Sequence, residues 1–368
     1  MLPENSFVER LEMRCFRNHF SSVFETGGRE YIQLIGPNGA GKTSVLEALY
    51  LLSVGRGIYT RKDSELAQAG QQGYFVEITW NGMNRLGLKF EKKSGRTVFE
   101  NEKIFKQWSE VLGRFRVVLF RPEDIELVVG GPRFRRQMLD ILLSQKKRKY
   151  FESLKRYRRA YRQHLGSFSF QNGKVQTAFE KLMAEEMPIL FEERKKAIRA
   201  LDKLCSLLME RCGFPGRMSL SYRPAIPKFV KEEETSQWTA AALEENRRLE
   251  RGGTQPIFGP QRDDIEISWN DKPLREFGSR GQKRLASLFI RLATAVIHYE
   301  SGVLPVLLLD DVLGELDGER LEGFLMLLKG WKWQIWVAGT DRQNLPTDWR
   351  PRRIFDIKRG TISGVTEF

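Results

Sequence analysis

The sequence predicts an α/β fold into which a long helical segment is inserted. Residues 31–54 pass from a short apolar run through a glycine-rich turn into helical spacing, which is typical of the start of an α/β unit. Residues 134–165 then keep apolar side chains at steps of three and four with almost no turn signals. Strand patterns return after residue 262, so an α/β core is interrupted and then resumed.

The individual elements follow from the same periodicities. The run YIQLIG at 31–36 predicts a strand, and the spacing that follows it predicts a helix to residue 55. Residues 73–120 hold short segments rich in Phe, Val, Ile and Trp, the last of them FRVVLF, which we expect to be antiparallel strands. Helical periods extend from residue 122 to about residue 249. The remaining predictions are a strand at 263–270, a helix from about 282 to 299, and strands at 303–310 and 334–339.

The order of these elements predicts two lobes. The sequence shows no internal repeat and no low-complexity linker, so the helical segment is interpreted as an insertion rather than a tethered domain. Residues 1–125 and 300–368 are expected to form a discontinuous first lobe, and residues 126–299 a helical second lobe.

Composition narrows the class of protein. With 41% hydrophobic residues, the 368-residue chain can bury a sizeable core, which excludes disordered and collagen-like classes. The apolar stretch at 303–309 is too short to span a membrane, the start of the chain lacks a secretion signal, and three cysteines without paired spacing disfavour disulfides and zinc. We therefore expect a cytoplasmic protein with no membrane association. The 61 Lys and Arg exceed the 47 Asp and Glu by 14, which favours a polyanionic partner, nucleic acid before acidic lipid or an acidic protein.

The sharpest local signal is GPNGAGKT at 36–43, a phosphate-binding loop between a predicted strand and a predicted helix. Glycines let phosphates approach backbone N–H groups at a helix N-terminus, where the helix dipole favours anions. We expect Lys42 to reach the β and γ phosphates and the Thr43 hydroxyl to ligate Mg²⁺. The alternative is a glycine-rich turn that carries a lysine by chance. The residues predicted to bind nucleotide here are Gly36, Asn38, Gly39, Gly41, Lys42, Thr43 and Ser44.

A carboxylate should follow a neighbouring strand, and VLLLDD at 306–311 supplies two. Asp310 would hold the metal, and Asp311 would polarise an attacking water, which indicates hydrolysis rather than transfer to a substrate hydroxyl. Lys42, Asp310 and Asp311 are the predicted catalytic residues. The alternative is an acidic pair that ends a buried strand and caps its turn.

A third motif precedes this strand. FGSRGQKR at 277–284 opens a long predicted helix, and by itself Ser279 is best interpreted as an ordinary N-cap. The motif follows the phosphate-binding loop and precedes the acidic strand, and this arrangement suggests a second interpretation. In that order Ser279, Gly281 and Gln282 match the signature motif of ABC-type ATPases.

With these motifs the whole chain resembles the RecF family of bacterial recombination-repair ATPases, which is related to the SMC and ABC families. The resemblance implies an α/β ABC-type ATPase head, with a P-loop core and an antiparallel β subdomain, plus a helical second lobe. The chain departs from the family pattern at Gln261, where the family usually has His, and at 339–341, which lacks the histidine of typical ABC ATPases. The segments that carry it are FRNH (16–19) and those at 36–56, 121–140, 259–264, 278–284 and 307–317.

The resemblance also implies partners and further site residues. It implies an ATP-dependent homodimer in which Ser279 and Gly281 of one protomer close on the nucleotide of the other, and it adds Arg17, Asp317 and Thr340 to the nucleotide-binding residues. ATP and Mg²⁺ are the expected cofactors, and the expected activity is a weak DNA-stimulated ATPase. The expected partners are double-stranded DNA and single-strand/double-strand junctions, RecR and RecO, with RecA loaded at gaps.

The basic residues point to the same partner independently. Residues 133–162 contain 12 Lys and Arg against two acidic residues, a local charge of +10, with tyrosines interleaved, which suits contacts to phosphates rather than bases. The alternative is a solvated helical face. The predicted DNA-binding residues are Arg133, Arg135, Arg136, Lys146, Lys147, Arg148, Lys155, Arg156, Arg158, Arg159 and Arg162.

Two other functions stay open at this point. One is an SMC-like nucleotide-gated DNA clamp or scaffold without meaningful turnover, which turnover measured beside DNA residence time would separate. The other is a P-loop kinase of small molecules, which leaves the motif at 279–282 and the basic segment unexplained.

Overall fold

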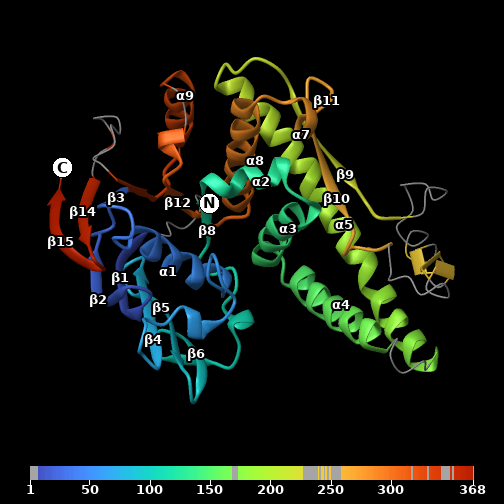
Figure 1. The fold of residues 1–368 in the computed structure, drawn as a ribbon, viewed down its shortest axis with the longest axis horizontal. Helices are drawn as coiled ribbons and strands as arrows, with labels where there is room; N and C mark the ends of the chain where they lie inside the picture. The colour runs from blue at the N-terminus through green and yellow to red at the C-terminus, as the bar shows by residue number, and fades with distance from the viewer. Residues whose placement is uncertain are drawn as a thin grey trace. The chain divides into compact units, whose positions relative to one another are not determined.

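The chain divides into two compact units in a computed structural model (Figure 1). The structure describes residues 7–167, 173–226, 258–315, 318–329, 331–340, 349 and 352–367, with isolated positions between 239 and 249. Unit 1 comprises Met1–Asp124, Glu210–Phe214 and Leu288–Phe368, and unit 2 comprises Ile125–Met209 and Pro215–Ser287. The last division falls inside a helix, whereas the predicted lobes meet after residue 299.

Unit 1 contains an antiparallel six-stranded sheet in the order β2-β1-β4-β5-β6-β7. Apolar side chains at alternate positions, such as Leu11 and Met13 of β1 and Val76 and Ile78 of β4, are buried, as expected for a sheet with one face toward the core. The strands are β1 (Val8–Phe16), β2 (His19–Glu25), β4 (Gly73–Trp80), β5 (Asn84–Glu91), β6 (Gly95–Glu100) and β7 (Lys103–Phe105).

The second sheet of unit 1 carries the site and has the order β15-β14-β3-β13-β12-β8. All neighbours are parallel except the first pair, β15 and β14, which is antiparallel. The central strands are buried at every position, which is typical of parallel strands covered on both faces. The strands are β3 (Tyr31–Ile35), β8 (Val117–Phe120), β12 (Val306–Asp310), β13 (Ile335–Gly339), β14 (Arg352–Lys358) and β15 (Thr361–Glu367).

Helix α1 (Lys42–Val54) contacts strands of both sheets, and its apolar residues join the main core of unit 1. It is hydrophobic around most of its circumference, as a helix buried between two layers must be. The helix ends where Gly55 takes a left-handed conformation (φ 77°) and its N–H bonds to the Leu51 carbonyl. Helix α9 (Gly318–Lys329) and the short turns Asp63–Glu65, Trp108–Glu110 and Leu313–Glu315 complete the elements described in this unit.

Unit 2 is mainly helical. Helices α4 and α5 run side by side (Figure 1) and are joined by the ion pair between Arg156 and Glu186, and Lys147, just before α4, pairs with Glu193 of α5. The helices are α2 (Glu126–Val129), α3 (Pro132–Lys146), α4 (Arg148–Ser167), α5 (Gly173–Arg211), α7 (Leu274–Phe277) and α8 (Arg280–Glu300), which continues into unit 1. The turn Pro122–Ile125 leads into this unit, and β9 (Met218–Arg223), β10 (Asp264–Trp269) and β11 (Lys272–Pro273) form a small sheet.

Two element predictions were wrong. FRVVLF at 115–120 was expected among the antiparallel strands, but β8 pairs with β12 in the parallel sheet, because its four residues are all buried. Residues Met218–Arg223, within the segment predicted to be helical, form strand β9 instead. They pair with β10, and this pairing buries Met218 and Leu220 on one face. Within the described ranges, no helix is both long and apolar enough to cross a membrane.

Candidate nucleotide site and basic helical face

The loop after β3 can only be built with glycine at two of its positions. Gly36 has a φ of 156°, and a Cβ there would lie 2.2 Å from the Ile357 carbonyl oxygen. Gly41 has a φ of 115°, and a Cβ there would lie 2.6 Å from Nε2 of His19. The backbone therefore wraps tightly and delivers the chain into the N-terminus of α1, where free N–H groups favour an anion.

Two residues at the turn between β1 and β2 hold this loop in place. Asn18 donates from Nδ2 to the carbonyl of Ala40 at 3.1 Å and accepts a hydrogen bond from the Ser44 hydroxyl at 3.1 Å. The buried His19 ring contacts the Gly41 carbonyl through Nε2 at 3.1 Å. Sequence reasoning did not identify either residue as part of the site, although both lie in the FRNH segment that the family resemblance selects.

Lys42 and Thr43 are directed toward the loop and the acidic strand. Lys42 is 5% exposed, and its Nζ donates to the carbonyls of Gly36 at 2.7 Å and Pro37 at 3.1 Å. The Thr43 hydroxyl donates to Oδ1 of Asp310 at 3.0 Å. The parallel strands β3, β13 and β12 bring their carboxyl ends to one edge of the sheet, which is why residues so far apart in sequence meet here.

Asp310 and Asp311 are adjacent but lie in different surroundings. Asp310 is buried, and burial, with the nearby charges of Asp311 and Glu123, raises its pKa to about 6, against the hydrogen bond from Thr43. Asp311 is exposed and adopts a left-handed conformation (φ 53°), with its N–H bonded to the Ala338 carbonyl at 3.2 Å. One acid faces the Thr43 hydroxyl, and the other faces the open side of the site.

A cavity of about 480 Å³ lies over the loop. It is lined by the loop and by Arg17, Asn18, Glu65, Ala67 and Asp311. This volume falls in the range of small-molecule sites. The donor set fits ATP with Mg²⁺, because helix N–H groups and Lys42 suit phosphates, and the Thr43 hydroxyl and Asp310 carboxylate are the oxygen ligands that Mg²⁺ prefers.

Arg17 reaches the wall of this cavity but is bound to the protein on one edge. Its Nε and Nη2 donate to the buried carboxylate of Glu47 at 2.6 and 2.9 Å, and its Nη1 donates to the Glu65 carbonyl at 2.8 Å. The hydrogen bond to Glu47 raises the pKa of Arg17, so the guanidinium stays charged. Any contact to a nucleotide would use the remaining N–H groups.

The signature motif lies in unit 2, at the start of α8. Ser279 is exposed and caps this helix, with its hydroxyl accepting from the Gln282 N–H at 3.2 Å and its own N–H donating to the Gln282 side chain at 2.8 Å. This reciprocal pair is a capping box, so Ser279 has the structural role expected of an N-cap as well as its predicted one. Gly281 is half-buried in the first turn. Thr340 is exposed directly after β13, and Asp317 lies outside the described residues.

The structure separates the predicted DNA-binding residues by burial. Arg135 is 5% exposed and donates to both carboxylate oxygens of Asp264 at 2.6 and 2.9 Å and to the carbonyls of Leu127 and Gly130. Its assignment to DNA is therefore corrected, because a guanidinium with these buried partners cannot reach a phosphate. Arg136, Lys146 and Lys147 are half-buried, and Arg136 donates to the Asp263 carbonyl at 2.5 Å.

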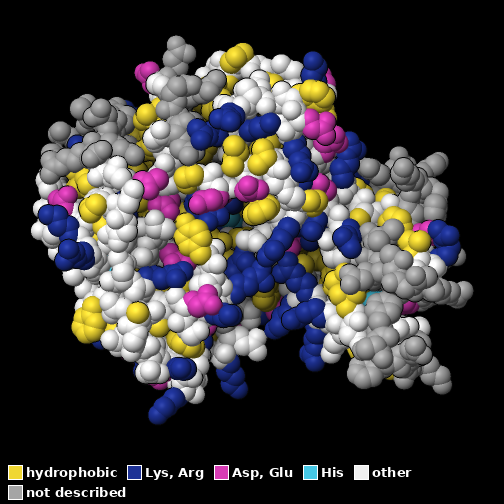
Figure 2. Space-filling model, in the orientation of Figure 1, with side chains coloured by type: hydrophobic (Ala, Val, Ile, Leu, Met, Phe, Trp, Pro, Cys, Tyr) yellow, Lys and Arg dark blue, Asp and Glu magenta, His cyan; other side chains and the backbone are white. Residues whose placement is uncertain are grey.

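The other predicted residues are exposed and lie mainly on α4. Lys155, Arg159 and Arg162 follow one another at helical spacings of four and three, so they share one face of that helix. Figure 2 shows Lys and Arg side chains gathered over α3 and the start of α4. Three of the exposed arginines are also ion-paired within unit 2, namely Arg148 with Glu152, Arg156 with Glu186 and Arg158 with Asp140.

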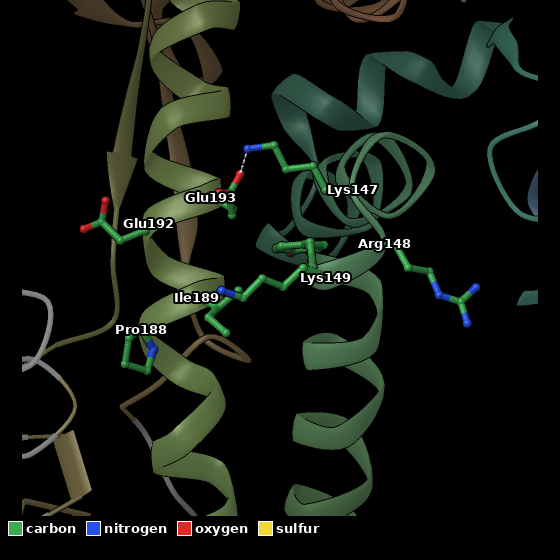
Figure 3. Close-up of a pocket in the computed structure, with 8 residues that line it drawn as sticks. Lys147, Arg148, Lys149, Pro188, Ile189, Glu192 and Glu193 are labelled. Atoms are coloured by element: carbon green, nitrogen blue, oxygen red, sulfur yellow. Dashed lines mark hydrogen bonds and ion pairs between the residues drawn. The ribbon is translucent and has the colours of Figure 1, made fainter. Parts of the chain in front are cut away.

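A second cavity, also of about 480 Å³, lies between α4 and α5 (Figure 3). Lys147, Arg148 and Lys149 line one wall, and the other wall includes Pro188, which interrupts the hydrogen-bond ladder of α5. Figure 3 shows Lys147 reaching Glu193 across it. The basic helix is thus tied to α5 rather than projecting alone.

Sequence comparison relates the chain to known repair proteins along nearly its whole length. The family described as RecF/RecN/SMC N terminal domain matches residues 7–362. The DNA replication and repair protein RecF of Halothermothrix orenii is 32% identical over 374 residues, covering 97% of this chain and 98% of that protein. The protein of the same name from Herpetosiphon aurantiacus is 32% identical over 384 residues, covering 96% and 97%.

Structural comparison gives the same result. A solved structure of the recombination mediator protein RecF-ATP in the RecFOR pathway is similar at a TM-score of 0.86 and 27% identity, covering 100% of this chain and 98% of that one. The Smc head domain of Pyrococcus furiosus is similar at a TM-score of 0.57 and 14% identity, covering 98% and 96%, which shows the fold alone. These similarities confirm the predicted fold class, an ABC-type ATPase head with a helical lobe.

Proposed function

The chain belongs to the RecF family, and we propose that it is an ATP-dependent DNA-binding protein of recombinational gap repair. The observation that carries the ATP part is the meeting of Thr43 with Asp310 beside the glycine loop. Lys42 and the N–H groups at the start of α1 would hold the phosphates, and Thr43 and Asp310 the Mg²⁺. Bound ATP would supply a γ-phosphate that two protomers share, and its cleavage would release them.

The signature motif lies in unit 2 and the phosphate-binding loop lies in unit 1, and we propose that a second protomer supplies this motif to the nucleotide. Ser279 and Gly281 are at an exposed helix N-terminus, which is a suitable site for the γ-phosphate held by another chain. We propose that this contact forms in trans, so that ATP joins two protomers into a dimer on duplex DNA. Asp311, exposed beside Asp310, would then polarise the attacking water, and slow hydrolysis of ATP would time the release of the dimer.

The DNA part rests on the exposed face formed by Lys155, Arg159 and Arg162, with the neighbouring basic residues of α3 and α4. These side chains suit phosphates, so binding should not depend on sequence and should fall steeply with salt. By analogy with the relative solved with ATP in the RecFOR pathway, we propose that the protein acts near single-strand gaps with RecR and RecO to assist RecA loading.

One experiment tests this function against its alternatives. Duplex DNA affinity, dimer formation and phosphate release are measured together with ATP, with ADP and without nucleotide. The proposal expects ATP to promote both dimerisation and DNA binding, with slow phosphate release that needs no acceptor. Release only in the presence of a small-molecule acceptor would indicate the kinase. ATP-dependent DNA binding without any release would indicate the SMC-like clamp.

A further inference from the structure

Two of the segments that carry the resemblance to the RecF family, at 121–140 and 259–264, meet around one buried arginine in unit 2. Arg194 of α5 has a side chain that is 2% exposed. Its Nη1 donates to Asp263 at 2.7 Å, and its Nη2 donates to Asp140 at 2.9 Å. Neither aspartate belongs to the nucleotide site, so their meeting here needs another explanation.

Each nitrogen of the buried Arg194 guanidinium donates at least one hydrogen bond. Arg194 also donates to the Pro260 carbonyl at 2.6 Å and, through Nε, to the Tyr150 hydroxyl at 3.1 Å. The Tyr150 and Tyr222 hydroxyls donate to Asp140 and Asp263, each at 2.5 Å. Burial raises the pKa of both tyrosines well above its usual value, so they remain donors at neutral pH. Such a network fixes the side chains that it contains.

Asp140 connects this network to the surface. Its Oδ1 accepts from Arg194 and Tyr150, whereas its Oδ2 accepts from Nη2 of Arg158 at 2.6 Å. Arg158 lies on α4, and its side chain is 58% exposed. One carboxylate thus has a buried oxygen in a fixed network and a second oxygen that holds an exposed guanidinium.

Arg158 keeps donors for a second partner. Its Nε and Nη1 make no hydrogen bond to a residue that the structure describes. Arg156, two residues earlier, differs because it binds Glu186 through both Nε and Nη2 and so turns its fork toward the protein. Arg158 is therefore held by one corner while the other N–H groups are available to a phosphate, whose oxygens accept such pairs well.

We propose that Asp140 is a positioning residue that sets the Arg158 guanidinium for a DNA backbone phosphate, with Arg194 fixing Asp140 from behind. The proposal rests on the DNA-binding function proposed above. An arginine that is already oriented loses less side-chain freedom when it binds, so the contact is stronger than that of a free side chain. The segments at 121–140 and 259–264 would then act on DNA through a surface residue that neither of them contains.

A double-mutant cycle tests this role. Duplex DNA affinity with ATP is measured for wild type, Asp140→Asn, Arg158→Ala and the double variant, with thermal unfolding recorded for each. We expect Asp140→Asn and Arg158→Ala each to weaken binding by about tenfold, and the double variant to bind like Arg158→Ala alone. Glu186→Gln is the matched control, since it removes the acid that pairs with Arg156, and it should change DNA affinity by less than about twofold.

The outcomes separate positioning from a general structural effect. If Asp140→Asn weakens binding by the same factor with and without Arg158, or tightens it, the proposal is overturned. Should Asp140→Asn fail to fold, Arg158→Lys keeps the charge without the fork, and affinity equal to wild type would overturn the proposal in its place. If the wild-type protein does not bind duplex DNA, the proposed function itself is wrong. If wild type binds but Arg158→Ala binds equally well, only the positioning proposal is overturned.

Discussion

The Thr43 hydroxyl donates a hydrogen bond of 3.0 Å to Asp310, although the two residues are 267 positions apart in the chain. The contact joins the first turn of α1 to the end of β12, two strands away from β3 in the parallel sheet. It places a hydroxyl and a carboxylate, the two oxygen ligands expected of a Mg²⁺ site, beside the phosphate-binding loop.

Lys42→Met is predicted to abolish ATP binding and the DNA binding that depends on ATP. Removing the ammonium from the loop should cost about 3 kcal/mol at the phosphates, or roughly a hundredfold in affinity. Isothermal titration with ATP and Mg²⁺ measures this directly. Lys89→Met is the control, since Lys89 pairs with Glu91 on strand β5, away from the loop. A folded Lys42→Met protein with normal ATP affinity would refute the assignment.

Asp311→Asn is predicted to bind ATP but to hydrolyse it slowly, so that the dimer accumulates. Asparagine tolerates the left-handed conformation that Asp311 adopts, so the fold should be unchanged. Asp310→Asn should instead weaken binding of the nucleotide with Mg²⁺. Size-exclusion chromatography with ATP, alongside phosphate release, distinguishes the two. An Asp311→Asn protein that stays monomeric or turns over normally would show that the two acids do not divide the work in this way.

Ser279 is predicted to act on the nucleotide of the partner protomer. Ser279→Arg should bind ATP yet fail to dimerise, and Ser279→Asp should do the same while keeping the helix cap, because aspartate is also a good N-cap. Mixing Ser279→Asp with Lys42→Met should restore at most one composite site per heterodimer. Loss of ATP affinity in monomeric Ser279→Asp would mean that the residue acts within its own chain.

The buried His19 is predicted to make the nucleotide-free protein less stable in acid. Burial lowers the pKa of His19 from its usual 6.5, so the unfolded chain binds the proton more readily than the folded one. The free energy of unfolding should therefore increase as the pH is raised toward 6.5 and level off above that pH. Urea unfolding between about pH 5 and pH 8 measures this slope. The unfolding free energy of His19→Gln should depend less steeply on pH. A slope equal to that of wild type would mean that another group causes the loss of stability in acid.

Charge reversal on the exposed face of α4 is predicted to weaken DNA binding without affecting dimerisation. Lys155, Arg159 and Arg162 are changed to Glu together, because they share one face and lie outside the nucleotide motifs. Affinity should fall for every duplex sequence, and the plot of log affinity against log salt should flatten by roughly one unit for each phosphate that the variant no longer neutralises. The control is reversal of exposed Lys89 and Lys103 on the antiparallel sheet. An unchanged salt slope in the triple variant would mean that DNA binds elsewhere.

Much of the fold and the site could be predicted from local sequence. The strand at 31–36, the helix that follows it, the helix that begins near Ser279 and the strand ending at Asp310 are each bounded by their own residues. Glycine spacing, helical periodicity and apolar runs act between near neighbours, so the sequence alone displays them. The same holds for the phosphate-binding motif, whose glycines are required by the backbone of the loop itself.

Other features were decided only when distant segments met. Arg135 and Arg159 look alike in the basic run, but Asp264, 129 positions from Arg135, binds that arginine in the interior and leaves Arg159 at the surface. FRVVLF resembles the neighbouring antiparallel strands in composition, yet its strand β8 pairs with β12 in parallel. The sequence by itself determined the phosphate-binding loop, the helix that follows it and the helix that begins near Ser279, because these depend on local geometry. Which arginine is buried and which strand pairs with which depended on contacts between residues far apart in the chain, 129 positions for Arg135 and Asp264, and only the tertiary structure brings those together.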